Sequence, residues 1–153
     1  RSRGLGDVYK RQYNKFADSI TVSETEWDFE RYKPDIIVIN LGTNDMSYAT
    51  TDERKAEFED GYLDFLKKVR SLNSDSYIFQ TYGVMGTSLE ENIENVRRKY
   101  MSETGDERIT FIPLTMQNED ADGIVADWHP SPKTHSLVSQ KVTAAIKETL
   151  GYK

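Results

Sequence analysis

Residues 35–45 read Asp-Ile-Ile-Val-Ile-Asn-Leu-Gly-Thr-Asn-Asp, an apolar run followed by a polar turn. The β-branched residues at 36–39 form the continuous run that is typical of a strand covered on both faces in a parallel sheet. The turn follows directly, and Gly42 allows it to bend tightly. We therefore predict that residues 36–39 form a central strand of a parallel sheet.

Helix and strand patterns alternate after this segment. The sequence predicts strands over 76–81 and 108–112, a helix opened by the capping pair Thr50 and Glu53, a helix opened by Ser88 with Glu91, and a last helix from the N-cap Ser131 to Leu150, closed by Gly151. The apolar stripes of these helices are Phe58, Tyr62, Phe65, Leu66, Val69 and Leu72; Leu89, Ile93, Val96 and Tyr100; and Leu137, Val138, Val142, Ala145, Ile146 and Leu150.

This alternation indicates an α/β fold, a three-layer α/β/α arrangement with a mostly parallel sheet of the flavodoxin-like kind. Only three clear strands are visible, whereas sheets average about five. We therefore expect that N-terminal βα units are missing. Residues 1–12 are basic and lack periodicity, and we interpret them as a non-native, artefactual segment.

Composition excludes several functional classes. The chain has 153 residues, the size of one domain. It has no cysteine, which excludes disulfides, thiolate zinc sites and a cysteine nucleophile. The net charge of −6 and the absence of a run of about 20 apolar residues argue against nucleic acid and membrane partners.

Loops that follow the strands of such a sheet share one edge, so residues 41–48, 82–87 and 114–130 should meet there. The first loop contains Asn44, whose amide can donate a hydrogen bond, although local chemistry alone favours an ordinary turn. The third contains Asp127, Trp128 and His129, in which a carboxylate can orient an imidazole that acts as a general base. The alternative is a surface loop before a helix. A metal site is not predicted, because no third His or Cys accompanies the pair.

Two segments carry a family resemblance. Residues 33–45 resemble the third conserved block of the SGNH (GDSL) hydrolases, and residues 127–131 resemble their fifth. Within that superfamily, Trp27 before the strand, the Asp two residues before His129, and Thr134-His135 are most similar to the acetylxylan esterases of carbohydrate esterase family two. The resemblance implies that residues 13–153 are the C-terminal part of an SGNH catalytic domain.

The resemblance also implies roles for single residues. Asn44 corresponds to the side-chain donor of the oxyanion hole, His129 to the catalytic base and Asp127 to its orienting carboxylate. Trp128, Gly42 and Met85 are our substrate-binding candidates, and no cofactor or metal is implied. The nucleophilic serine and the second-block glycine have no match.

Ser19 imitates the nucleophile of the first block, and we interpret it as a decoy. No apolar strand precedes it, and the residues between Thr21 and Pro34 are too few for the two crossovers that the family requires. The nucleophile is then lost with the missing N-terminus.

The resemblance implies deacetylation of xylan or related saccharides by serine-type acyl transfer. Family members often carry an N-terminal β-sandwich domain and are often secreted. Two alternatives remain open: another SGNH lipase or acyl esterase, which would need an apolar rim where the loops look polar, and a non-catalytic carbohydrate-binding module.

Overall fold

The computed structural model describes residues 15–18, 21–26 and 28–152. The expectations for residues 1–12, Ser19 and Trp27 concern positions outside the described residues. The elements are the strands β1 (Lys15–Asp18), β2 (Thr21–Glu26), β3 (Ile36–Asn40), β4 (Tyr77–Tyr82) and β5 (Ile109–Pro113), the α-helices α2 (Asp52–Leu72), α3 (Glu90–Thr104), α4 (Glu119–Asp122) and α5 (Pro132–Leu150), and the 3-10 helices η1 (Asp45–Ser47) and η2 (Ala126–Trp128).

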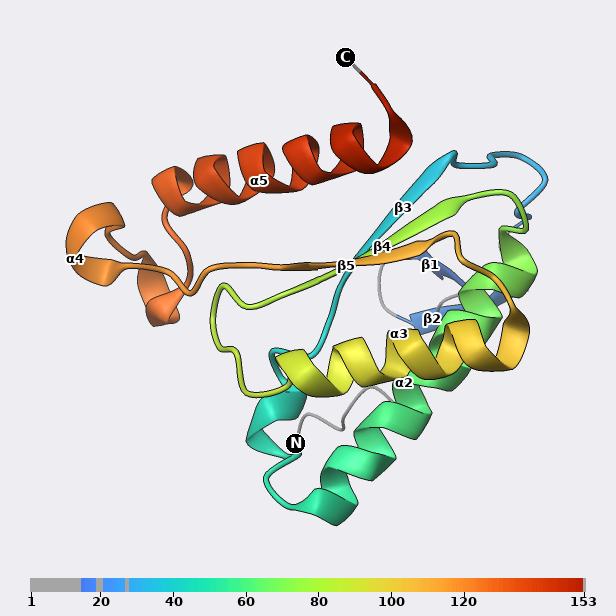
Figure 1. Ribbon diagram of the computed structural model, residues 1–153, viewed down its shortest axis with the longest axis horizontal. Coiled ribbons are helices and arrows are strands. Elements are labelled where there is room, and N and C mark those ends of the chain that lie inside the picture. Colours follow the sequence, from blue (N-terminus) through green and yellow to red (C-terminus); the bar gives the residue numbers. More distant parts are fainter. Residues whose placement is uncertain (1–14, 19–20, 27, 153) are drawn as a thin grey trace.

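β3, β4 and β5 form a parallel sheet with helices on both faces, which confirms the predicted three-layer α/β/α fold (Figure 1). α2 and α3 cover one face, where Tyr62, Leu66 and Ile93 are fully buried. α5 covers the other face and packs its stripe on Phe79 and Ile112. Leu137 departs from the predicted stripe, because it lies at the margin of the α5 contact and is 48% exposed.

The order of the sheet corrects one prediction. β4 is the central strand of the described sheet and β3 lies at its edge. The run at 36–39 is also not covered throughout, because Val38 on the α5 side is 48% exposed, while Ile39 on the α2 side is buried. A β-branched run favours a strand, but which strands flank it depends on pairing that the run does not encode.

Two of the predicted helix starts are wrong by one residue. α2 is capped by Thr51 and not Thr50, since Thr51 has extended backbone angles and its hydroxyl accepts from the Arg54 N–H. α3 has Leu89 at its N-cap without a side-chain cap, because buried Leu89 belongs to a turn in which Glu90 N–H donates to the Thr87 carbonyl.

The last helix begins and ends as predicted. The Ser131 hydroxyl accepts from the Thr134 N–H at 3.2 Å, and Pro132 occupies the first turn, where its missing N–H costs nothing. Gly151 closes α5 in the left-handed conformation with φ of 72°. The position of the Asp127–His129 segment before α5 is therefore fixed by a strong capping signal.

β1 and β2 were not predicted from the sequence. They pair antiparallel, with Asp18 opposite Thr21 and Lys15 opposite Glu26, in a sheet separate from β3, β4 and β5. Their residues alternate little in polarity, so periodicity gives no strand signal there.

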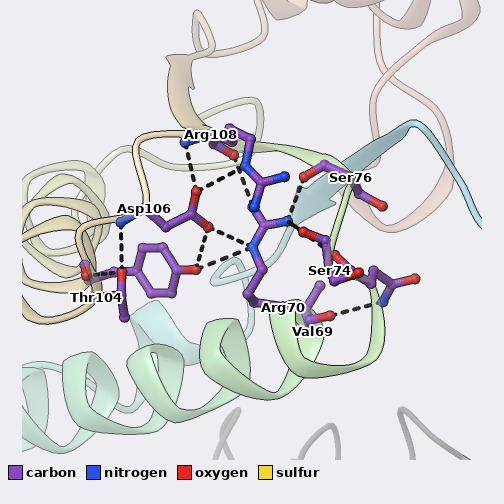
Figure 2. Close-up of polar contacts among 9 residues, drawn as sticks. Val69, Arg70, Ser74, Ser76, Thr104, Asp106 and Arg108 are labelled. Carbon is purple, nitrogen blue, oxygen red and sulfur yellow. Dashed lines mark hydrogen bonds and ion pairs between the residues drawn. The ribbon is translucent and has the colours of Figure 1, made fainter.

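A cluster of polar contacts surrounds Arg70 (Figure 2), which donates to the carbonyls of Ser76 and Arg108, just before β4 and β5 begin. The Arg70 Nε lies 2.6 Å from Asp106 Oδ2, and both side chains are about six-sevenths buried, at 14% and 15% exposed. The Arg70 Nη1 donates to the carbonyls of Asn73, Ser74 and Ser76 at 3.1, 3.2 and 2.6 Å. One guanidinium thus satisfies the carbonyls that follow α2, which have no partner within the helix.

We expect Arg70→Ala to lower the free energy of unfolding by about 3 kcal/mol, because it removes one of the two cations beside the buried Asp106 carboxylate and the donor to the Ser74 and Ser76 carbonyls. Urea unfolding followed by circular dichroism measures the loss. The control is Lys99→Ala, whose pair with Asp60 at 3.0 Å is about half exposed and should contribute at most about 1 kcal/mol. Equal losses in the two variants would contradict a stabilising role for the Arg70 cluster.

Asp106 should make the fold sensitive to acid. Burial by itself raises the pKa of this carboxyl, but the Arg108 N–H, the Tyr100 hydroxyl and the Arg70 charge together outweigh burial and lower the pKa. A lowered folded pKa stabilises the fold above the ordinary carboxyl range, and the stabilisation is lost as pH falls below about 4. We expect Asp106→Asn to be less stable at neutral pH and to lose less stability between about pH 5 and 2, as measured by urea unfolding across pH.

Candidate active site

Three loops leave the carboxyl ends of β3, β4 and β5 and contact one another in series, as predicted. The loop after β5 is tied to β4 by the Leu114 N–H, which donates to the Tyr82 carbonyl at 2.7 Å. The Gln117 N–H donates to the Val84 carbonyl at 2.9 Å. Gly86 of the same β4 loop packs against Met46 of η1, the element that follows β3. The loops therefore form a continuous rim.

Two glycines allow this close approach. Gly83 has φ of +137°, and a Cβ there would lie 2.2 Å from the Leu114 carbonyl oxygen, so only glycine fits. Gly42 has φ of +120°, and a Cβ would lie 3.2 Å from the Tyr82 ring. Gly42 is buried beneath the rim, so its role here is to shape the backbone of the loop that carries Asn44.

Asn44 is exposed at the start of η1. The Met46 N–H donates to the Gly42 carbonyl at 3.0 Å, and the Ser47 hydroxyl donates to the Asn44 carbonyl at 2.9 Å. Asp45, which follows, is 5% exposed, and its carbonyl accepts from two N–H groups of the next turn. The local fold thus buries the carboxylate and leaves the amide of Asn44 on the solvent side.

The loop before α5 contains a strained turn. Asp127 and Trp128 both have positive φ, 54° and 60°. This left-handed conformation costs a side-chain-bearing residue about 1–2 kcal/mol, and a bulky residue such as Trp adopts it only under constraint. Such strain persists where the surroundings over-determine it, often at functional sites.

His129 follows this turn, and its imidazole is held by a backbone carbonyl. The ring Nδ1 lies 3.1 Å from the Ala126 carbonyl oxygen, which also accepts from the His129 N–H at 3.2 Å. Donation from Nδ1 leaves Nε2 unprotonated and able to accept a proton. Asp127 is exposed, and the described residues show no hydrogen bond between Asp127 and His129. The structure therefore brings Ala126, and not the carboxylate of Asp127, to the ring.

Trp128 is half-buried and held at both its polar groups. Its indole N–H donates to a carboxylate oxygen of Glu119, and its carbonyl accepts from Gln117 Nε2 at 2.9 Å. Met85 is half-buried in the turn from Gly83 to Gly86 on the neighbouring loop. No sequence pattern points to Ala126, Gln117 or Glu119. The contact of Ala126 is made by its carbonyl and leaves no side-chain motif, and the other two residues lie in an ordinary polar loop.

The rim is more apolar than the sequence indicated. Met116, Ile124 and Val125 are 46%, 41% and 47% exposed in the segment between β5 and His129. Within the described part of the chain, no three His, Cys, Asp or Glu side chains are placed to hold a metal ion. No described helix has the length and apolarity needed to cross a membrane.

A parallel α/β/α domain with Asn44 and His129 on loops at one carboxyl edge is an SGNH-type hydrolase fold. The chain belongs to the GDSL-like lipase/acylhydrolase family, which matches residues 9–137. Among curated proteins it is similar to the cellulase/esterase CelE of Acetivibrio thermocellus, with 34% identity over 148 residues, 91% of this chain and 17% of that protein.

Two solved structures are also similar. One is a family two carbohydrate esterase from Clostridium thermocellum in complex with cellohexaose, with a TM-score of 0.76 and 36% identity over 86% of this chain and 41% of that one. The other is an acetyl xylan esterase from the rumen bacterium Butyrivibrio proteoclasticus, with a TM-score of 0.76 and 27% identity over 83% of this chain and 40% of that one. The chain thus spans less than half the length of each of these relatives.

Proposed function

We propose that the chain carries the histidine and asparagine part of the active site of a carbohydrate O-acetyl esterase. The observation that carries the proposal is the His129 imidazole, held through Nδ1 on the rim that also carries the exposed Asn44. The similarity to family two carbohydrate esterases supports the acetyl group as the acyl group and a saccharide as the alcohol.

The proposed reaction is a two-step acyl transfer. A serine hydroxyl attacks the acetyl carbonyl while His129 Nε2 takes its proton, and the Asn44 amide donates to the oxyanion that forms. The C–O bond to the sugar then breaks, and the sugar oxygen receives the proton from His129. Water attacks the acyl-serine in the same manner, which releases acetate and restores the serine. These steps use a serine, His129, Asn44 and water, and none of them requires a metal ion.

The nucleophile, in this proposal, lies outside the chain. Ser19 follows β1, which pairs antiparallel with β2 and not with the parallel sheet, whereas the nucleophile of such a fold follows a strand of that sheet. Asp18 pairs with Thr21, and the two residues between them in the sequence are too few for a crossover helix. We therefore propose that Ser19 is not the nucleophile.

A second candidate is an esterase for longer acyl chains. The exposed Met116, Ile124 and Val125 provide the apolar surface that such a chain would contact, and the sequence alone did not indicate it. The same surface, with the half-buried Trp128, also suits the apolar face of a sugar ring. Comparing acetyl with octanoyl esters of one alcohol separates the two candidates, because only the second favours the octanoyl ester.

Acetate release from acetylated xylo-oligosaccharide tests the proposal. The chain alone should release acetate no faster than its His129→Ala variant, because the base has no serine to activate. Fused behind the part of the Clostridium esterase that precedes the matched region, the chain should release acetate, and His129→Ala should abolish it. Activity of the chain alone that Ser19→Ala removes would show that Ser19 is the nucleophile after all.

A further inference from the structure

The peptide group between Trp128 and His129 is fixed at both ends. Its carbonyl accepts from Gln117 Nε2 at 2.9 Å, and its N–H donates to the Ala126 carbonyl at 3.2 Å. The imidazole of His129 is bound to that same Ala126 oxygen. The orientation of this one peptide plane therefore decides whether the ring reaches its acceptor.

Gln117 is built to hold the peptide plane. Gln117 is 8% exposed, and its backbone N–H donates to the Val84 carbonyl of the neighbouring rim loop. The amide orientation is determined, because exchanging Nε2 and Oε1 would place two oxygens at the 2.9 Å distance to Trp128. The Oε1 is buried and has no hydrogen-bond partner among the described residues. Within the described part of the chain, the Gln117 side chain therefore makes its hydrogen bond to the Trp128 carbonyl through Nε2.

We propose that Gln117 is a positioning residue for His129: it holds the left-handed turn at Asp127 and Trp128 and thereby selects the Nδ1–H form of the imidazole. Neither residue of the turn is glycine, so both positive φ angles are strained, and we expect them to relax when the Gln117 restraint is removed. The hydrogen bond from the Val125 N–H to the His129 carbonyl at 2.9 Å would remain, but it does not hold the peptide plane between Trp128 and His129. Relaxation rotates the Trp128 carbonyl and moves the His129 ring away from Ala126. This role in catalysis rests on the proposed function, whereas the selection of the tautomer does not.

Glu119 also contacts the turn, and its role differs. Glu119 is exposed, and its carboxylate accepts from the indole N–H at the far end of the Trp128 side chain. It therefore fixes the indole and not the peptide plane. Removing the Glu119 carboxylate should leave the His129 tautomer unchanged.

Nitrogen-15 NMR of the chain as it stands tests the proposal without catalysis. At about pH 8, above the ordinary histidine range, long-range correlation spectra distinguish the protonated ring nitrogen from the bare one. We expect His129 to be protonated at Nδ1 and bare at Nε2. His135 is exposed in α5 and serves as an internal reference. A wild-type His129 protonated at Nε2 would overturn the proposal.

The decisive variant is Gln117→Met, which keeps the length of the side chain and removes the donor. We expect the unprotonated ring nitrogen of His129 to change from Nε2 to Nδ1 in this variant. We also expect the three-bond couplings between the amide proton and Hα of Asp127 and Trp128 to change from the values typical of positive φ. The matched control is Gln140→Met on the exposed face of α5, and Glu119→Ala tests the indole contact. Retention of the Nδ1–H form and of both couplings in Gln117→Met would overturn the proposal.

A further measurement covers the case in which Gln117→Met does not fold. One side-chain amide proton of wild-type Gln117 should exchange slowly with solvent and show a through-hydrogen-bond coupling to the Trp128 carbonyl carbon. Fast exchange and no coupling would refute the restraint. If these signatures are present and the fused enzyme releases no acetate, the proposed function fails while the positioning of His129 by Gln117 stands.

Discussion

Replacing His129 with alanine should lower kcat/KM for acetylated xylo-oligosaccharide by at least about 10⁴-fold in the fused enzyme, because both acyl-transfer steps lose their base. The initial rate of acetate release under substrate-limiting conditions measures the loss. His135→Ala is the control, since His135 is exposed in α5, and it should leave the rate unchanged. A loss of less than about 10-fold in His129→Ala would exclude His129 as the base.

The companion variant Asp127→Asn separates two ways of orienting the ring. The Ala126 carbonyl lies 3.1 Å from His129 Nδ1, so we expect the loss in Asp127→Asn to stay below about 10-fold. Where a carboxylate does orient a catalytic histidine, the same change costs about 10⁴-fold. A loss of that size would show that Asp127 turns toward His129 in the complete site.

Most of the helices and strands could be predicted from the sequence, because hydrophobic periodicity and capping are local signals. Phe58, Tyr62 and Leu66 were predicted from their spacing and are buried as expected. Ser131 was predicted as an N-cap from its place before Pro132, and its hydroxyl caps α5. Where two hydroxyl residues competed, as at Thr50 and Thr51, local pattern did not decide which one adopts the extended backbone.

Strand pairing and long-range contacts could not be predicted from the sequence. The edge position of β3 follows from hydrogen bonds to β4, which lies about 40 residues further along the chain. The Arg70 cluster joins the end of α2 to Asp106 after α3, and no spacing rule relates those positions. The sequence therefore predicted which segments are strands and helices better than where they lie in the sheet.

The candidate site was likewise predictable only in part: the positions of its loops were predicted, and the backbone conformation of one loop was not. The loops of Asn44 and His129 were predicted to share a rim, and the contacts between Gly86 and Met46 and between Gln117 and Val84 connect them. The conformation of the His129 loop was not predictable, because positive φ is expected at glycine and here falls on Asp127 and Trp128.

Asn44→Ala should lower kcat of the fused enzyme by about 100-fold to 1,000-fold, or roughly 3–4 kcal/mol, while KM changes little. The exposed Asn44 amide has an oxyanion to bind only after attack on the carbonyl, so its loss acts on the transition state and not on the bound sugar. Acetate release across a range of acetylated xylo-oligosaccharide concentrations separates the two constants.

The control for Asn44→Ala must leave the amide in place and change its surroundings. Ser47→Ala does so, because it removes only the hydroxyl that donates to the Asn44 carbonyl at 2.9 Å on an exposed surface. We expect that variant to lose less than about 10-fold in kcat, since one exposed hydrogen bond is worth about 1 kcal/mol. An Asn44→Ala enzyme that keeps kcat and loses affinity for the saccharide would make the loop from Gly42 to Asp45 a sugar-binding turn. That result would favour a carbohydrate-binding module, because a binding site needs complementarity to the ground state and gains nothing from a donor aimed at an oxyanion.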